Sequence, residues 1–169
     1  MESSKSYENY PGWLVLTSNL VSLLIYALGF LIISGFGLVF SLLYLLYILI
    51  LEFRLLRYHC TSCYYFGRTC GFGKGRVSSW LFQKGDVAKF CSNDFTWKDM
   101  IPDLLVSLIP FITGIGLLIL NFNLLLLAAL LLLSILTTSG NGFIRGKLTC
   151  KNCKQRELGC PAYELFDKG

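Results

Sequence analysis

The stretch NYPGWLVLTSNLVSLLIYALGFLIISGFGLVFSLLYLLYILIL, residues 9–51, contains no charged side chain. One membrane crossing needs about 20 apolar residues, so these 43 residues have the right length for two crossings and a tight turn. Helices of soluble proteins interleave polar residues at a period of 3.6, and this stretch does not. It therefore predicts a transmembrane helical hairpin, with helices over residues 13–33 and 38–56.

A second uncharged stretch, residues 104–144, has almost the same length. Pro102 precedes it much as Pro11 opens the first stretch, and proline is well tolerated at the first position of a helix. We expect a second hairpin here, with helices over residues 101–120 and 124–139. The sequence thus predicts an all-α integral membrane protein with four transmembrane helices.

A cysteine pattern, C-x2-C-x6-C, follows each hairpin. The two triads are Cys60, Cys63, Cys70 and Cys150, Cys153, Cys160. Two hairpins, each followed by the same spacing, indicate two tandem repeats over residues 1–70 and 101–169, joined by a linker over 71–100. Because each repeat crosses the membrane twice, we expect a pseudo-twofold axis along the membrane normal, with the triads facing one another across it.

The 15 basic residues all lie outside the two uncharged stretches. Positively charged segments stay on the cytoplasmic side, so both termini and the central loop are predicted to be cytoplasmic in a multi-pass protein of the cell membrane. The net charge of +5 is then explained by a basic surface facing anionic lipid head groups. We therefore expect the lipid bilayer as a partner, and no nucleic acid.

The linker contains a candidate amphipathic helix over residues 76–84. Val77, Trp80 and Leu81 recur at helical spacing, and Trp80 and Phe82 are expected to dip toward the lipid at the membrane surface. Simple packing of this helix on the cysteine region is an equally good alternative. Tyr10 and Trp13 are expected in the head-group layer, which is rich in tyrosine and tryptophan.

The predicted cytoplasmic location bears on the chemistry of the cysteines. Thiols in the cytoplasm are kept reduced, so paired C-x2-C motifs read as metal ligands or redox thiols rather than as disulfides. One arrangement is a shared four-thiolate site of Cys60, Cys63, Cys150 and Cys153, with the third cysteine of each triad completing or flanking it.

Two further arrangements stay open. Each triad could hold its own metal, with His59 or Cys91 as a fourth ligand in the first half and Glu157, Glu164 or solvent in the second. Alternatively the triads could hold iron–sulfur clusters, and Cys160 is followed by proline as in many cluster motifs.

Zinc is favoured over an iron–sulfur cluster and over unmetallated thiols. Zinc needs no redox partner, and its binding would contribute folding free energy to two loops. Thiol chemistry has an argument of its own, because neighbouring positive charge lowers a thiol's pKa. The basic residues near the triads are Arg57, Arg68, Lys151, Lys154 and Arg156.

The function expected from these features is that of a small membrane protein with a cytoplasmic metal-binding cysteine module. Its role would be structural, or it would dock a cytosolic protein partner. The alternative is a membrane electron-transfer or thiol-redox protein passing electrons to a lipid-phase quinone. No Ser/His/Asp set, intramembrane carboxylate pair or nucleotide loop is visible, which favours a non-enzymatic protein; an enzyme would be an oxidoreductase.

Overall fold

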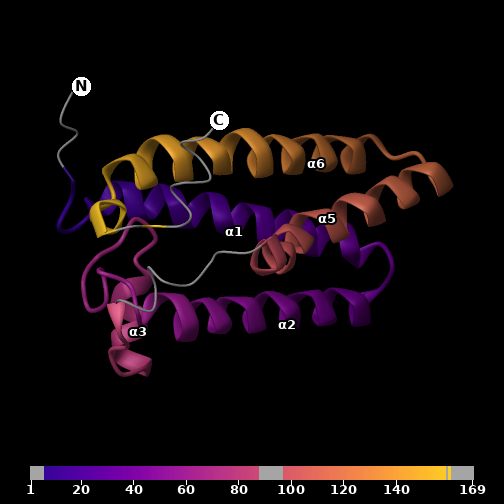
Figure 1. Cartoon of the computed structure of the whole chain (residues 1–169). Coiled ribbons are helices and arrows are strands. Elements are labelled where there is room, and N and C mark those ends of the chain that lie inside the picture. Colours follow the sequence, from indigo (N-terminus) through magenta and orange to yellow (C-terminus); the bar gives the residue numbers. More distant parts are fainter. Residues whose placement is uncertain (1–5, 88–96, 159, 161–169) are drawn as a thin grey trace. The chain divides into compact units, whose positions relative to one another are not determined.

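The structure, a computed structural model, describes residues 6–87, 97–158 and 160. Every regular element in this part of the chain is helical (Figure 1). Four of the described helices are long and apolar enough to cross a membrane: Gly12–Ser34, Leu38–Cys60, Ile101–Leu120 and Leu124–Asn152. The predicted all-helical class with four apolar helices is confirmed, whereas the tandem repeat stays a prediction.

The first hairpin joins α1 (Gly12–Ser34) to α2 (Leu38–Leu55). Gly37 has a φ of +121°, a conformation that side-chain-bearing residues rarely adopt, and so it permits the reversal. α2 continues into a π-helical turn, η1 (Leu56–Cys60), which carries the chain without a break to the first cysteine.

The second hairpin joins α5 (Trp97–Leu120) to α6 (Leu124–Ile135). The side chain of Asn123 caps α6, because its Oδ1 accepts a hydrogen bond of 2.9 Å from the backbone N–H of Leu125. Such caps satisfy the free N–H groups at the start of a helix.

The fourth apolar helix continues past residue 139, where we expected it to end. After α6 the chain forms wider π-helical turns, η2 (Leu136–Gly140) and η3 (Phe143–Thr149), and then the 3₁₀ turns η4 (Cys150–Asn152) and η5 (Lys154–Leu158). Hydroxyl groups support the transition, since Thr137 and Thr138 donate to carbonyls one turn earlier, at 2.8 and 2.7 Å.

The chain divides into two compact units. What we call the cysteine unit contains, among the described residues, 6–19, 53–87, 143–158 and 160; the helical unit contains 20–52 and 97–142. α3 (Lys74–Leu81), in the linker, belongs to the cysteine unit. Each unit is described by itself.

In the helical unit, α1 packs against α6 through a small core. Ile25 and Ile32 meet Leu130 and Leu133, and all four are at most 7% exposed. Gly114 of α5 lies against this contact, because a Cβ there would be 2.7 Å from the Leu130 side chain. Small residues of this kind let membrane helices approach closely.

A second contact in the helical unit joins three helices at Tyr44. The Tyr44 hydroxyl of α2 donates a 2.7 Å hydrogen bond to the Val106 carbonyl of α5. Pro110 lies four residues after Val106 and has no N–H, so it cannot supply the usual helical partner of that carbonyl. Gly29 of α1 makes room for the hydroxyl, which a Cβ at that position would overlap.

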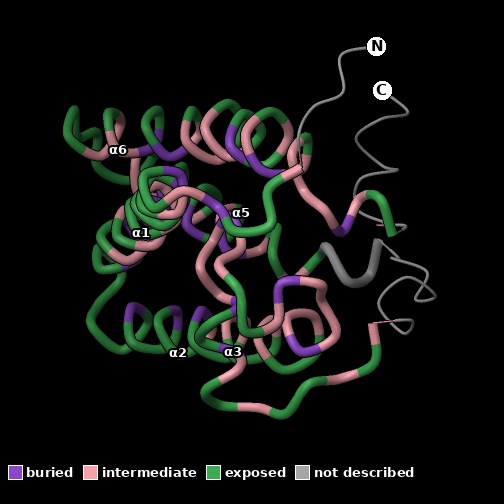
Figure 2. The backbone as a smooth tube through the Cα atoms, turned by 90° about the vertical axis from the view of Figure 1, so that its left-hand side faces the viewer, coloured by how far each residue is buried: buried purple, intermediate pink, exposed green. Residues whose placement is uncertain are grey.

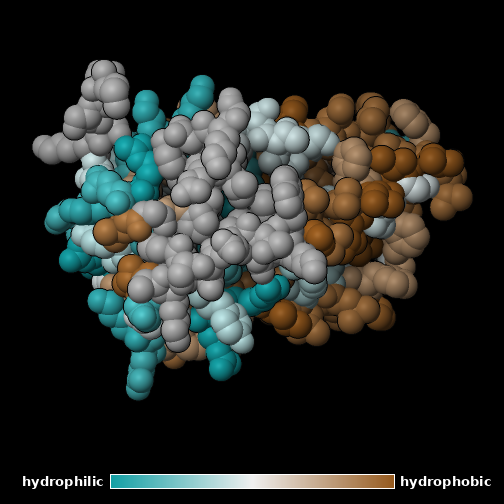
Figure 3. Space-filling view, in the orientation of Figure 1, coloured by the Kyte–Doolittle hydropathy of each residue, from teal (hydrophilic) through white to brown (hydrophobic). Residues whose placement is uncertain are grey.

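The remaining surface of the helical unit is largely apolar. Leu, Ile and Phe side chains on successive turns of α2 are about half exposed. Hydrophobic side chains predominate on the part of this unit that is left uncovered in Figure 3. The buried stretches of α2 and α6 are short and are separated by exposed residues (Figure 2). Helices that are apolar all round suit a lipid environment.

Candidate functional site

The described cysteines of both triads all belong to the cysteine unit. Cys60 ends η1, and Cys63 and Cys70 lie in the turns that follow. Cys150 begins η4, Cys153 comes directly after it, and Cys160 follows η5. All six are partly buried free thiols.

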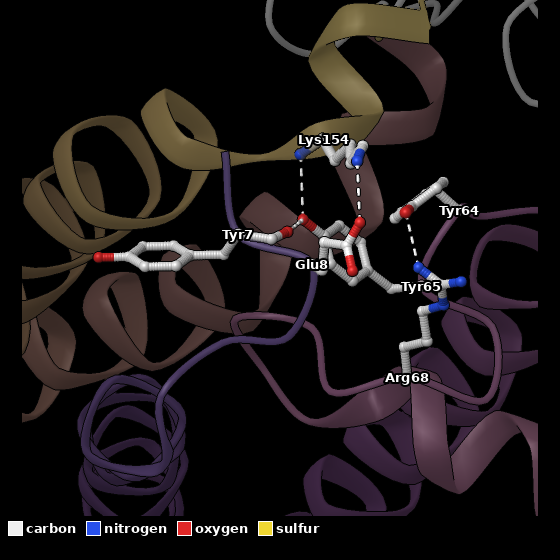
Figure 4. A network of polar contacts seen from close by, with 6 residues as sticks. All are labelled: Tyr7, Glu8, Tyr64, Tyr65, Arg68 and Lys154. Atoms are coloured by element: carbon white, nitrogen blue, oxygen red, sulfur yellow. Dashed lines mark hydrogen bonds and ion pairs between the residues drawn. The ribbon is translucent and has the colours of Figure 1, made fainter. Parts of the chain in front are cut away.

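The two triads lie in segments that we call the cysteine segments, residues 60–71 and residues 149–158 with 160. An N-terminal segment, residues 7–10, hydrogen-bonds to both of them. The backbone N–H of Tyr7 donates to the Asn152 carbonyl at 3.0 Å, beside a parallel bridge between Tyr7 and Cys153. The Tyr7 carbonyl in turn accepts a 2.6 Å hydrogen bond from the Tyr65 hydroxyl (Figure 4). Tyr7 therefore joins the second cysteine segment to the first.

Tyr10 makes the same connection three residues later. Its backbone N–H donates to the Thr69 carbonyl at 2.9 Å, next to Cys70. Its hydroxyl donates to the Thr149 carbonyl at 2.7 Å, next to Cys150. Residues 7–10 thus hydrogen-bond to the segments that carry both triads.

Tyr10, Leu14 and Tyr65 form the core of the cysteine unit and are at most 5% exposed. We call these three residues the aromatic core. The rings of Tyr10 and Tyr65 lie 5.5 Å apart at a tilt of 59°, a favourable geometry for an aromatic pair. Cys63 and Cys153 pack against this core from different triads.

Cys70 packs there too. The structure therefore brings thiols of both triads to one place. The other three thiols are close enough to interact electrostatically with these. Cys60 interacts with Cys63, and Cys150 and Cys160 interact with Cys153. Cys63 and Cys153 link the two triads, because a charge on Cys153 would act on Cys63.

Burial decides the protonation of the thiols of Cys63 and Cys153. It raises the pKa of Cys63 to about 12, an effect that the Tyr65 backbone N–H opposes and that charge on neighbouring cysteines increases. Burial likewise raises the pKa of Cys153, although backbone N–H groups of Gln155 and Arg156 oppose it. The expected lowering of thiol pKa by basic neighbours is therefore outweighed at these two positions, where desolvation favours the neutral thiol.

The second cysteine segment is also fixed by polar contacts to the first. The Gln155 side chain is 2% exposed, and its Oε1 accepts a 2.7 Å hydrogen bond from the Tyr64 backbone N–H. The Lys154 backbone N–H donates to the Tyr65 hydroxyl at 3.0 Å (Figure 4). Since buried polar groups are costly when unpaired, these bonds define the register of the two segments.

The ion pair in the same network is peripheral. Lys154 Nζ lies 3.2 Å from Glu8 Oε1, and the Glu8 side chain is 69% exposed. The hydrogen bond to the Glu8 carboxylate and the nearby phenolic oxygen of Tyr64 raise the pKa of Lys154. Exposed pairs of this kind contribute little to stability.

Close packing between the segments also depends on glycine. Gly71 is buried against Thr149, and a Cβ on Gly71 would overlap the Thr149 methyl group. Gly75, at the start of α3, is buried against the carbonyl of Tyr65 in the same way. The glycine-rich composition after the first triad thus provides contact surfaces for the second triad and for α3.

No group of three or more His, Cys, Asp or Glu side chains within the described ranges is already arranged to hold a metal ion. His59 lies in η1 immediately before Cys60, and Glu157 lies in η5. Cys91 and Glu164, the other possible ligands, lie outside the described residues.

Several residues that build the site were not among the expected ones. The sequence pattern assigns no role to Tyr7, Tyr65, Thr149 and Gln155. Tyr10, predicted to lie in the head-group layer, is 5% exposed inside the cysteine unit. The available signal was the density of tyrosine near the first triad and at the N-terminus.

The fold and the site together define a helical protein with four potentially membrane-spanning helices and a unit that gathers two cysteine triads. No protein-family model, curated protein or solved structure matches the chain.

Proposed function

We propose that the chain is a multi-pass membrane protein whose cysteine unit binds a metal ion, zinc in preference to others, through thiols of both triads. Both termini would then lie in the cytoplasm. The observation that carries this proposal is the packing of Cys63 and Cys153, from triads with identical spacing, against one aromatic core.

The contacts favour a shared site over two separate ones. Cys63 interacts with cysteines of its own triad and with Cys153 of the other, so a single ion between them can draw ligands from both. The thiols would have to turn toward the ion, since no three of the described side chains are already arranged around it. Metal binding coupled to such closure adds to folding stability.

The raised pKa values of Cys63 and Cys153 argue against reactive free thiols. The thiolate is the nucleophile in thiol chemistry, and Cys63 with a pKa raised to about 12 is almost entirely protonated at neutral pH. A zinc ion displaces that proton outright. We therefore assign the triads a structural role in joining the N-terminal segment to the two cysteine segments.

Metal analysis of protein purified in detergent without chelator tests this proposal. We expect stoichiometric zinc, and its loss in both Cys63→Ser and Cys153→Ser. Cys91→Ser is the matched comparison, because a shared site of the two triads should keep its zinc in that variant. Cobalt substitution provides a second measurement, since the intensity and position of its absorption bands report how many thiolates bind.

Three results would contradict the proposal. Zinc retained in Cys153→Ser but lost in Cys91→Ser would indicate a site within the first half. Brown protein containing iron, with broad visible absorbance, would indicate an electron-transfer protein. Metal-free protein whose cysteines change state with dithiol reagents would indicate thiol chemistry.

We also propose that α3 lies in the head-group layer of the membrane. Its inner face is made of small residues, with Gly75 buried and the Ser78 hydroxyl donating to the Leu56 carbonyl at 3.1 Å. Its outer face exposes Val77, Trp80 and Leu81, and Trp80 is 83% exposed. A tryptophan beside basic residues suits the boundary between lipid and water.

A further inference from the structure

The helical unit contains a partly open cavity of about 550 Å³. The cavity is lined by the end of α1, the turn that follows it, the first half of α2 and the middle of α5. Its volume falls in the range of about 300–1,000 Å³ that is typical of sites for small molecules. Gly116 leaves part of the space open, because a Cβ there would meet no atom within 4 Å.

The polar groups in the wall are already used by the protein. The Tyr44 hydroxyl donates to the Val106 carbonyl at 2.7 Å, and the Tyr47 hydroxyl donates to the Pro102 carbonyl at 2.8 Å. The Thr113 hydroxyl donates to a carbonyl of its own helix. None of these three hydroxyls has a hydrogen left to offer to an occupant.

This pairing restricts the chemistry of the occupant. A molecule with carbonyl groups would bury them without a donor, which is unfavourable in apolar surroundings. A saturated chain has no hydrogen bonds to lose on entry, and it contacts the Ile, Phe and Leu side chains of the wall. The wall therefore suits a hydrocarbon chain and does not suit a quinone ring.

The mouth of the cavity is apolar as well. Phe36, Phe40 and Ile112 line the cavity and are between 48% and 61% exposed. They lie in or beside segments that are long and apolar enough to cross a membrane, so bilayer lipid is what reaches them there.

We infer that this cavity is a binding site for one acyl chain of a bilayer phospholipid. The inference requires that the four helices are inserted in a membrane, and it is independent of metal binding by the cysteine unit. It also means that the cavity is no entry point for a lipid-phase electron carrier.

Photo-crosslinking in lipid nanodiscs tests the inference. The probe is a phosphatidylcholine with a diazirine near the end of one acyl chain, and labelled peptides are identified by mass spectrometry. We expect labelling to concentrate severalfold on Phe36, Phe40 and Ile112 over Leu49 and Leu131, which are equally exposed elsewhere in the helical unit. Equal labelling of all five residues would show ordinary surrounding lipid and overturn the inference.

Filling the cavity provides a second measurement. Gly116→Leu should reduce the concentrated labelling severalfold, whereas Gly142→Leu should not, because Gly142 is equally free of neighbours and lies outside the cavity. Labelling that is unchanged in Gly116→Leu would overturn the site. A diazirine-bearing quinone should give no labelling that responds to Gly116→Leu, and such labelling would overturn the restriction to hydrocarbon chains.

Discussion

Val106 carries a backbone carbonyl that Pro110 deprives of its helical donor, and the Tyr44 hydroxyl of another helix supplies the missing hydrogen bond. In a membrane a proline is tolerated where neighbouring groups satisfy the freed backbone. The same bond ties α2 to α5, so one residue both repairs a helix and fixes a helix pair. The contact is possible only because Gly29 leaves space for the hydroxyl.

The first prediction concerns this pairing. Tyr44→Phe should lower the free energy of unfolding by roughly 1 kcal/mol, the size of an interhelical hydrogen bond in a membrane protein. In a Pro110→Ala background the effect should shrink, because alanine restores an N–H that can bond the Val106 carbonyl. Unfolding of the four proteins in micelles measures this double-mutant cycle.

An equal loss from Tyr44→Phe in both backgrounds would show that the hydroxyl does not act through the carbonyl freed by Pro110. Tyr47→Phe is a useful comparison, since the Pro102 carbonyl to which Tyr47 donates lies four residues before Val106, a residue with its own N–H. Its loss should not depend on Pro110.

The second prediction concerns the contact between the cysteine segments. Gly71→Ala should push the segments apart, because the added Cβ overlaps the Thr149 methyl group, and zinc content should fall. Thr149→Ser removes that methyl group and keeps the hydroxyl, so the double variant should recover much of the zinc. The measurement is metal content after purification, with Gly12→Ala as the control because nothing lies near Gly12.

Recovery is the decisive outcome here. A double variant as poor in zinc as Gly71→Ala alone would mean that Gly71 is needed for a reason other than space beside Thr149. Loss of zinc in Gly12→Ala would show that the assay responds to any change near the N-terminus.

At the scale of elements, α3 packs on the cysteine unit, as one of the two alternatives for the linker predicts, and its contact with lipid stays a proposal. Its small residues pack on the cysteine unit, and its large apolar residues remain exposed on the other side. A spacing of three and four residues cannot by itself reveal which stripe faces inward when one stripe consists of Gly75 and Ser78. The small stripe is the packed one because the turn at Tyr65 approaches α3 at backbone level.

The third prediction follows from the proposed place of α3. Trp80 should be quenched by lipids brominated high on their acyl chains, and little by aqueous iodide. The chain has three tryptophans, so the Trp80 signal is obtained as the difference between the parent protein and Trp80→Phe in nanodiscs. Strong iodide quenching of that difference signal would place α3 in water and end the proposal.

The extension of the fourth apolar helix is an element-scale feature that composition did not indicate. Glycines at 140, 142 and 146 favour an early end because each lowers helix propensity. The chain stays helical because wide turns and threonine hydroxyls satisfy its carbonyls, including those that Thr149 bonds at Ile144 and Arg145. The second triad therefore begins directly at a helix end.

At the scale of the whole molecule, the sequence predicts the helices better than the site. The four apolar helices follow from the absence of charge over residues 9–51 and 104–144, which is a local property. The thiols that meet are indicated by their repeated spacing. The residues that bring them together are not, because Tyr10 and Thr149 are 139 positions apart and no local pattern links them.

The fourth prediction concerns stability against pH in metal-free protein. The folded state raises the pKa of Cys63 from an ordinary 9.0 to about 12, so the folded chain keeps a proton that the unfolded chain releases. The retained proton contributes to the free energy of unfolding. That contribution is complete below about pH 9 and is lost as pH rises toward 12. Burial raises the pKa of Cys153, Tyr10 and Tyr65 in the same direction, which adds to the loss.

Chemical unfolding of the metal-free protein at a series of pH values from 8 upward measures this effect. Cys63→Ala should show a shallower decline, because one of the contributing groups is gone. Stability that is constant or rises over this range would mean that the thiol is not buried as described.

The way in which residues 7–10 hold both cysteine segments has a consequence for biosynthesis. Tyr10 leaves the ribosome long before Thr149, to which it bonds 139 positions later, and at about 5–20 residues per second this delay is on the order of ten seconds. The first three apolar helices and most of the fourth are made within that interval. In the proposed membrane protein, the nascent chain would therefore enter the translocation machinery before Tyr10 can bond Thr149. A metal ion shared by both triads would bind only after translation has passed the second triad.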